Sequence, residues 1–118
     1  MNHFTPKEFR CRCGRCGLGF EYMDAGLLVH LDQARKIAGV PFTVTSAVRC
    51  EAHNTNVGGS PTSSHIKGYA VDIAARDDHQ REQIVRGLVN AGFRRIGIAK
   101  TFVHVDVDPD KRSAMWVY

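Results

Sequence analysis

The sequence contains no apolar run long enough to cross a membrane, and its first residues lack the apolar segment of a secretory signal. We therefore expect a protein without a membrane partner, made in the cytosol, that reaches any extracellular substrate only through lysis or another export route. Internal repeats, low-complexity tracts and interdomain linkers are missing as well. A chain of 118 residues is long enough for a sizeable core but short for two, so we expect one domain over residues 1–118.

Positive charge is in excess, but it is not gathered in one basic run. Sixteen Lys and Arg residues against twelve Asp and Glu give a net charge of +4, which suits an anionic partner such as a bacterial cell wall or a nucleic acid. An ordinary solvated basic surface explains the same excess. Because the sequence lacks the aromatic–basic alternation and the recognition helix of nucleic-acid-binding proteins, we expect no nucleic-acid partner.

The four cysteines are unevenly placed. Cys11, Cys13 and Cys16 form a C-x-C-x-x-C pattern within residues 1–21, which we expect to be an irregular arm, and Cys50 lies far away in sequence. Together they suit a small tetrahedral structural metal site, but disulfides and free thiols are alternatives. A cytosolic origin argues against permanent disulfides. The spacing leaves these alternatives open.

Two helices are expected from apolar spacing and from their end signals. The first follows an N-cap at Asp24 and ends at Gly39, before Pro41; the second follows Asp77 or Asp78 and ends at Gly92. Their buried faces are expected to comprise Leu27, Leu28, Leu31, Ala34 and Ala38 in the first helix, and Ile84, Val85, Leu88 and Val89 in the second.

Four strands are expected, over residues 42–48, 69–74, 93–98 and 102–107, the last being the final strand of the chain. Residues 49–63, between the first two, are polar and contain Gly and Pro, which indicates a long loop of functional or mobile character. Trp116 and Tyr118 follow the last expected strand, and either a core-covering or a site-lining role suits them.

Three polar residues indicate a metal site. His65 and Asp72 lie seven positions apart around Gly68, and Asp72 falls in an apolar run, where a carboxylate is costly unless it is paired or metal-bound. In residues 102–107, valines alternate with His104 and Asp106, so the two polar side chains share one strand face. Two His and one Asp are a sufficient ligand set for a catalytic zinc with an open position for water. These residues point to a metallohydrolase.

The pattern S-x-H-x-x-G-x-A-x-D at residues 63–72, with H-x-D at residues 104–106, resembles the zinc D-alanyl-D-alanine carboxypeptidase family. That family also includes D-alanyl-D-alanine dipeptidases of vancomycin resistance and phage endolysins that cut L-alanyl-D-glutamate links. The resemblance covers about half the chain, from near Thr43 to Asp106, and is greatest to the small peptidases of phages and prophages. It implies a small α+β domain of the hedgehog/DD-peptidase type, with flanking helices and an antiparallel sheet that carries the zinc. We expect a monomer.

By this resemblance, Zn²⁺ is bound by His65, Asp72 and His104. Arg49 falls where the family has an S-x-x-R segment whose Arg contacts the substrate, and Ser63 is a second candidate for substrate binding. Arg49 can hold a developing oxyanion or a substrate carboxylate. The implied reaction is hydrolysis of peptide bonds in peptidoglycan stem peptides, of the D-Ala-D-Ala carboxypeptidase or L-Ala-D-Glu endopeptidase type.

The sequence departs from the family at the general base. Several members carry Glu three residues before the last His ligand, where this chain has Thr101, and Phe102 occupies the next suitable position. Asp106 is the best remaining candidate for the catalytic base, or it orients an imidazole or Arg49 instead. Weaker candidates for the base are Asp108, His53 and His3. The alternative function is a zinc-containing wall-binding or phage-assembly module without turnover.

Overall fold

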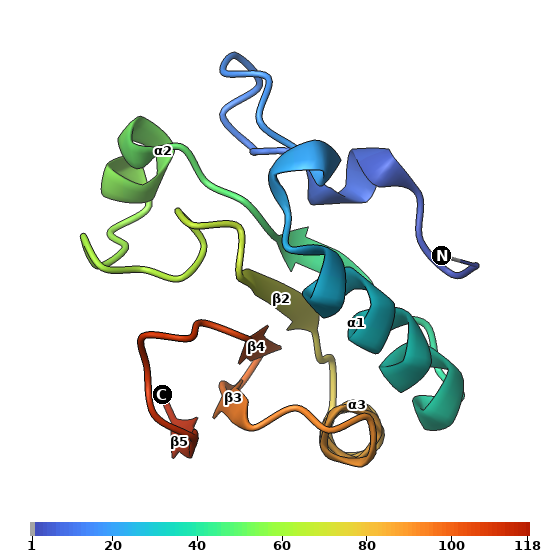
Figure 1. Cartoon of the computed structure of the whole chain (residues 1–118). Coiled ribbons are helices and arrows are strands. Elements are labelled where there is room, and N and C mark those ends of the chain that lie inside the picture. The colour runs from blue at the N-terminus through green and yellow to red at the C-terminus, as the bar shows by residue number, and fades with distance from the viewer. Residues whose placement is uncertain (1) are drawn as a thin grey trace.

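The computed structural model describes residues 2–118, and in it three helices accompany a five-stranded sheet (Figure 1). The helices are α1 (Ala25–Ala38), α2 (Glu51–Asn56) and α3 (Asp78–Asn90), with two short 3-10 helices, η1 (Pro6–Phe9) and η2 (Phe20–Tyr22). The strands are β1 (Val44–Ser46), β2 (Ala70–Ala74), β3 (Arg95–Ile98), β4 (Phe102–Asp106) and β5 (Ala114–Val117). The predicted α+β class is confirmed.

The strand order is β1-β2-β4-β3-β5. The first three pairings are antiparallel, as expected, but β5 runs parallel to β3, so the sheet is mixed. The expectation that residues 102–107 hold the final strand was therefore wrong. Strand β5 lies at the sheet edge, and Val117 is 80% exposed, so the strand lacks the apolar alternation that would reveal it in the sequence.

Helix α1 begins and ends where its capping residues predict. The side chain of Asp24 accepts a hydrogen bond from Leu27 N at 2.9 Å, and Gly39 adopts the left-handed conformation at φ 70°. Helix α3 likewise begins after Asp77, whose side chain accepts a hydrogen bond from Gln80 N at 2.7 Å.

The buried face of α3 differs from the prediction. Val89 is 47% exposed rather than buried, because the contact with α1 is centred on Ile84, Gly87 and Leu88. A Cβ at Gly87 would lie only 2.6 Å from the carbonyl oxygen of Ala34, so the glycine lets the two helix backbones approach closely. Two further residues expected to be buried, Val85 and Ala38, are only half-buried.

Two segments expected to be irregular contain helical turns. The arm over residues 1–21 includes η1 and the beginning of η2, and the loop over residues 49–63 includes α2. Cys50 is the N-cap of α2, and its sulfur accepts a hydrogen bond from His53 N at 3.4 Å. Cysteine is not among the common N-cap residues, so the start of this helix could not be predicted from its capping residue. The strands are also shorter than expected: β1 covers residues 44–46 instead of 42–48.

The two faces of the sheet have different roles. Val71 and Ile73 of β2, and Val103 and Val105 of β4, pack with the helices in the hydrophobic core. On the opposite face, Asp72 lies directly across from His104 in the antiparallel register of β2 and β4. The period-two alternation along both strands thus separates the core from a polar face.

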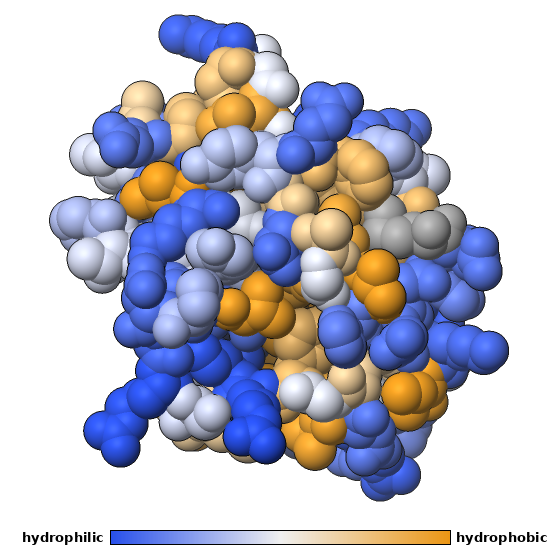
Figure 2. All heavy atoms as spheres, viewed as in Figure 1, coloured by the Kyte–Doolittle hydropathy of each residue, from blue (hydrophilic) through white to orange (hydrophobic). Residues whose placement is uncertain are grey.

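The outer surface is mixed in character. Figure 2 shows hydrophilic side chains over much of one face of the molecule, with apolar side chains gathered between them. Among the helices of residues 2–118, none is long and apolar enough to span a membrane.

Candidate metal centre

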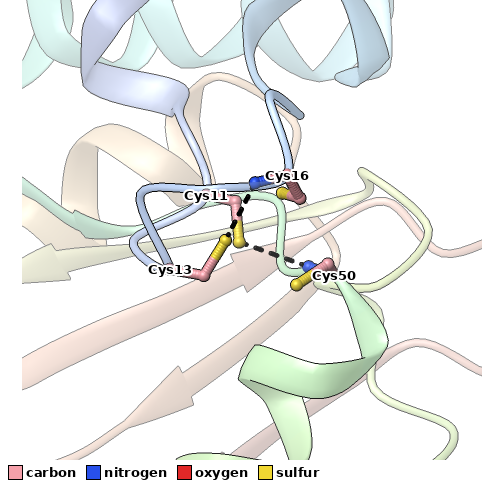
Figure 3. A group of neighbouring side chains, drawn as sticks. All are labelled: Cys11, Cys13, Cys16 and Cys50. Atoms are coloured by element: carbon pink, nitrogen blue, oxygen red, sulfur yellow. Dashed lines mark hydrogen bonds between the residues drawn. The ribbon is translucent and has the colours of Figure 1, made fainter.

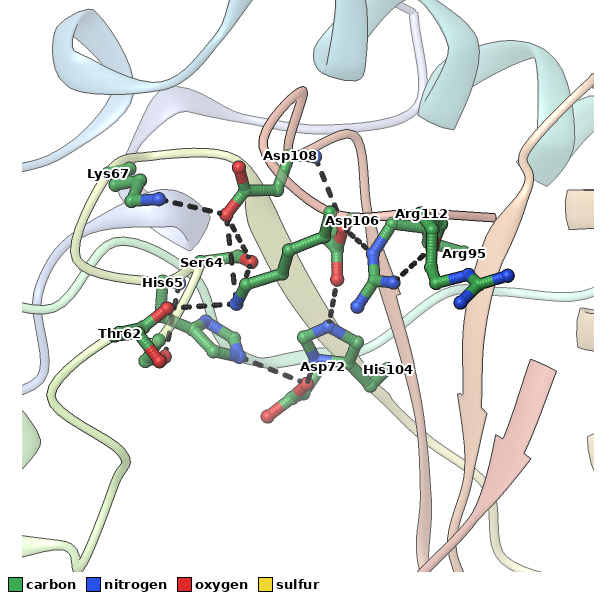
Figure 4. A network of polar contacts seen from close by, with 12 residues as sticks. Thr62, Ser64, His65, Lys67, Asp72, Arg95, His104, Asp106, Asp108 and Arg112 are labelled. Atoms are coloured by element: carbon green, nitrogen blue, oxygen red, sulfur yellow. Dashed lines mark hydrogen bonds and ion pairs between the residues drawn. The ribbon is translucent and has the colours of Figure 1, made fainter. Parts of the chain in front are cut away.

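His65, Asp72 and His104 meet on the polar face of the sheet. One ligand atom from each lies within 4.8 Å of the others, and all three residues are buried. Asp72 Oδ1 lies 3.2 Å from His65 Nε2 and 2.9 Å from His104 Nδ1 (Figure 4). His65 lies in the loop between α2 and β2, residues 57–69, which we call the metal loop. His65 and two residues of facing strands, Asp72 and His104, therefore direct their polar atoms toward one position.

The outward nitrogen of each imidazole already has a hydrogen-bond acceptor. His65 Nδ1 lies 2.7 Å from the carbonyl oxygen of Ala47, and His104 Nε2 lies 2.7 Å from Asp106 Oδ2. Because carbonyl and carboxylate oxygens accept hydrogen bonds, the imidazole proton lies on each outward nitrogen. The lone pair of the inward nitrogen is then available to bind a cation. Two imidazole nitrogens and one carboxylate fit zinc, with a further position open to water.

The pKa values of Asp72 and His104 are both shifted by the contacts within this ligand set. Burial alone would raise the pKa of Asp72, but its close contacts with His104 and His65 outweigh burial and hold that pKa well below its usual range. Burial would lower the pKa of His104, but its hydrogen bonds to Asp106 and Asp72 raise it instead. Zinc and a proton therefore compete for His104 Nδ1.

Arg49 is held beside the metal ligands. Its Nε donates to Ser46 Oγ at 3.1 Å, its Nη1 donates to Asn54 Oδ1 at 3.2 Å, and its Nη2 lies 3.6 Å from Asp72 Oδ2. The side chain is only 15% exposed. Arg49 thus lies beside Asp72, with its guanidinium held by the side chains of Ser46 and Asn54.

Asn54 is a functional residue that the sequence analysis missed. It is 2% exposed, and its Nδ2 donates to the carbonyl oxygen of Ser60 at 2.9 Å while its Oδ1 accepts from Arg49. A Cβ at Gly59 would lie 2.1 Å from Asn54 Oδ1, so only glycine leaves room for this amide. No local pattern marks Asn54, because its partners depend on the course of the loop after α2.

The site opens into a cavity of about 380 Å³. Around the three metal-site residues it is lined by Arg49, Val57, Gly58, Gly59, Ser60, Ser63, Ser64, Arg95, Phe102, Asp106, Lys111, Trp116 and Tyr118. Trp116 and Tyr118 thus line the site rather than cover the core. The Trp116 ring lies 5.5 Å from that of His104 and 4.8 Å from the guanidinium carbon of Arg95.

Asp106 is buried between β4 and β3. Its Oδ2 faces His104, while its Oδ1 accepts from Arg95 Nε at 2.7 Å and from Asp108 N at 3.1 Å. Burial would raise the pKa of Asp106, but the hydrogen bonds from His104, Arg95 and Asp108 lower it. Asp106 is therefore an ionised carboxylate with both oxygens engaged.

The other candidates for site residues lie in different surroundings. Ser63 lines the cavity, and its Oγ accepts from His65 N at 3.2 Å. His53 lies in α2 near the cysteines, and His3 pairs with Asp32 of α1 at 3.1 Å. Thr101, at the position of the missing Glu, is exposed.

A second polar network ties the metal loop to the segment after β4 (Figure 4). Asp108, fully buried, accepts from Ser64 Oγ at 2.8 Å and pairs with Lys67 at 3.3 Å. Lys111 joins it, donating to Ser64 Oγ at 2.9 Å and to the carbonyl oxygen of Thr62 at 2.8 Å. This network fixes the loop that carries His65.

The four cysteines also come together, near the N-terminus of α2 (Figure 3). Their sulfurs lie within 4.8 Å of one another, and all four are free thiols. The arm and the distant Cys50 are thus joined in space, as a single metal ion shared by the four cysteines requires.

With this geometry in view, the comparison with protein families is decisive. The model of the family described as Peptidase M15 matches residues 2–108, which include the three metal-site residues and all four cysteines. The chain belongs to the peptidase M15 family. M15 peptidases are zinc metallopeptidases, and the group formed by His65, Asp72 and His104 is suited to the metal. A search of curated proteins finds no match to this M15 peptidase.

Proposed function

We propose that this M15 peptidase hydrolyses peptide bonds in peptidoglycan stem peptides, as a D-Ala-D-Ala carboxypeptidase or an L-Ala-D-Glu endopeptidase. The observation that carries the proposal is the orientation of His65 and His104, whose outward nitrogens have acceptors and whose inward nitrogens meet Asp72 beside an open cavity. When bound there, zinc polarises the scissile carbonyl and lowers the pKa of its water to about 7, so that part of it is hydroxide at neutral pH.

Arg49 supplies the positive group that the substrate needs. Ser46 and Asn54 fix its guanidinium, so binding a substrate carboxylate or a developing oxyanion costs little further ordering. A planar fork of donors matches a carboxylate, which stem peptides present at their C-terminus and side chains. Arg49 therefore orients the peptide with its scissile carbonyl toward the three metal-site residues.

The rest of the cavity lining suits a short acidic peptide. Lys111 adds positive charge, and the rings of Phe102, Trp116 and Tyr118 offer apolar surfaces for small side chains such as those of alanine. Ser63, also on the lining, supplies a hydroxyl for a peptide amide or carbonyl.

Asp106 acts on His104 rather than on the attacking water. Its side chain is 1% exposed, and its two oxygens are occupied by His104, Arg95 and a backbone N–H of the chain. In this role the carboxylate fixes the imidazole orientation and raises the basicity of the nitrogen that faces the metal. Asp106 is thus a positioning residue.

The test is to incubate the zinc-loaded protein with purified peptidoglycan of several wall types and identify new amino groups and fragments by mass spectrometry. Release of D-alanine identifies a carboxypeptidase, and new N-terminal D-glutamate identifies an endopeptidase. Binding of zinc and peptidoglycan with no release from any wall type would contradict the peptidase proposal.

A further inference from the structure

A second cluster of potential metal ligands lies apart from the cavity, at the junction of the N-terminal arm and α2. Cys11, Cys13 and Cys16 approach from the arm, and Cys50 from the N-cap position of α2 (Figure 3). We propose that these four cysteines bind one structural zinc ion, which holds Arg49 and α2 in place on the catalytic cavity.

The distances fit a tetrahedral thiolate site. With zinc–sulfur bonds of about 2.3 Å, four sulfurs at the corners of a tetrahedron lie about 3.8 Å apart. All four sulfurs here lie within 4.8 Å of one another, so small side-chain rotations close the site. Four soft thiolates select zinc over the hard cations magnesium and calcium.

Backbone N–H groups surround the sulfurs as they would surround bound thiolates. Cys13 Sγ accepts from Arg15 N and Cys16 N, both at 3.3 Å, and Cys16 Sγ accepts from Leu18 N at 3.4 Å. Each of these donors lies two or three residues after the sulfur that it faces, so the chain wraps around that sulfur. Such hydrogen bonds stabilise the negative charge that four thiolates bring to one metal ion.

The two sulfurs at the arm–helix contact also accept backbone hydrogen bonds. Cys50 N donates to Cys11 Sγ at 3.3 Å, and His53 N donates to Cys50 Sγ at 3.4 Å. Every one of the four sulfurs therefore accepts at least one backbone hydrogen bond.

Two glycines make the turns around the sulfurs possible. Gly14 and Gly17, directly after Cys13 and Cys16, adopt φ values of 73° and 75°, in the left-handed region that other residues rarely enter. Two of the six glycines with positive φ among the described residues therefore lie in the turns around these thiols. A pair of disulfides would need two separated sulfur pairs, whereas all four sulfurs here converge on one point.

The site is connected directly to substrate binding. Cys50 follows Arg49 in sequence and caps α2, and Asn54 of that helix accepts a hydrogen bond from Arg49. A helix of six residues is not stable by itself, so α2 needs an anchor at its first turn. Zinc bound through Cys50 provides that anchor and preserves the position of the guanidinium.

The test combines zinc analysis with substitution at each site. We expect the wild type to bind two zinc ions per chain, and both Cys16→Ser and His104→Ala to bind one. The matched control His79→Ala, at an exposed position of α3, is expected to keep both. Cobalt binding to His104→Ala should give the strong thiolate-to-metal absorption of a sulfur site, and this measurement does not depend on the folding of a cysteine variant.

Loss of the thiolate site should also loosen α2. In Cys16→Ser we expect faster amide hydrogen exchange over residues 51–56, and KM raised several-fold with a smaller change in kcat. One zinc per wild-type chain that His104→Ala abolishes, or four thiols that react freely in the zinc-loaded protein, would overturn the inference. Failure to cleave peptidoglycan with two zinc ions bound would contradict the proposed function only.

Discussion

Asp106 Oδ2 lies 2.7 Å from His104 Nε2, on the side of the imidazole that faces away from Asp72. The imidazole is therefore placed between two carboxylates, one at the metal position and one behind it. This relationship explains why β4 carries polar residues at two alternate positions of an otherwise apolar strand, and it leads to a prediction about metal affinity.

Asp106→Asn should weaken zinc binding at the catalytic site by about 10- to 100-fold, because loss of a carboxylate behind a ligating imidazole commonly has this effect. The pH dependence should change as well. Wild-type affinity should fall as pH drops through the raised pKa of His104, since protons then compete for Nδ1. Without the Asp106 charge, that fall should begin at a lower pH.

Chelator competition at pH values above and below the ordinary histidine pKa of about 6.5 measures both effects. Unchanged affinity and an unchanged pH profile in Asp106→Asn would show that the carboxylate does not position His104. Loss of turnover with zinc affinity intact would instead support a role for Asp106 as the catalytic base.

Arg49→Lys should lower kcat/KM by about 10- to 100-fold, because a hydrogen bond to a charged group contributes about 1.5–3 kcal/mol and lysine lacks the planar fork. Zinc content should not change, since Arg49 is not a ligand. Steady-state kinetics on a soluble stem peptide measure the effect. The matched control is Arg76→Lys, at an exposed position outside the cavity, and equal losses in both variants would contradict the assignment.

Gly59→Ala should impair activity through Asn54. The added Cβ would lie 2.1 Å from Asn54 Oδ1, so the amide must move and Arg49 loses its acceptor. Overpacking of this kind costs about 1–3 kcal/mol of stability. Thermal unfolding and kinetics of the purified variant measure the two effects, and a variant with wild-type stability and KM would refute the role given to the Gly59–Asn54 contact.

Asp108 should contribute to stability at neutral pH and lose its contribution in acid. Burial would raise the pKa of Asp108, but hydrogen bonds from Ser64, the backbone and Lys67 lower it. Because the folded pKa is depressed, the stabilisation is present above the unfolded value of about 3.9 and disappears as pH falls through the lower folded value.

Asp108→Ala should therefore destabilise the protein at neutral pH by about 1–3 kcal/mol, because buried Ser64 loses its hydrogen-bond acceptor and partly exposed Lys67 loses its ion-pair partner. Denaturant unfolding of both proteins over a range of pH values measures the difference, which should narrow in acid. A constant difference across that range would indicate lost packing rather than lost charge.

The sequence was most informative where chemistry and local pattern coincide. Asp24 and Gly39 mark the ends of α1 through their own conformational preferences, and alternation placed His104 and Asp106 on one strand face. His65 and Asp72 could be grouped with His104 because an isolated carboxylate is costly in an apolar strand.

The features that could not be predicted depend on contacts between distant segments. Helix α2 was not predicted, because its N-cap is Cys50 rather than a common capping residue. Strand β5 was not predicted, because an exposed edge strand lacks the apolar alternation of a strand with one buried face. The sequence did not indicate that Arg95 lies between Asp106 and Trp116, because this position depends on the pairing of β5 with β3. Local sequence pattern therefore indicated the three metal-site residues. The residues that position them could be identified only from the three-dimensional structure.

The most direct test measures zinc content and amine release from peptidoglycan together, on the wild type, His104→Ala and the control His79→Ala. We predict that His104→Ala loses one zinc ion and all amine release, while the control matches the wild type in both. Zinc content unchanged by removal of the His104 imidazole would contradict the claim that His65, Asp72 and His104 form the catalytic metal site.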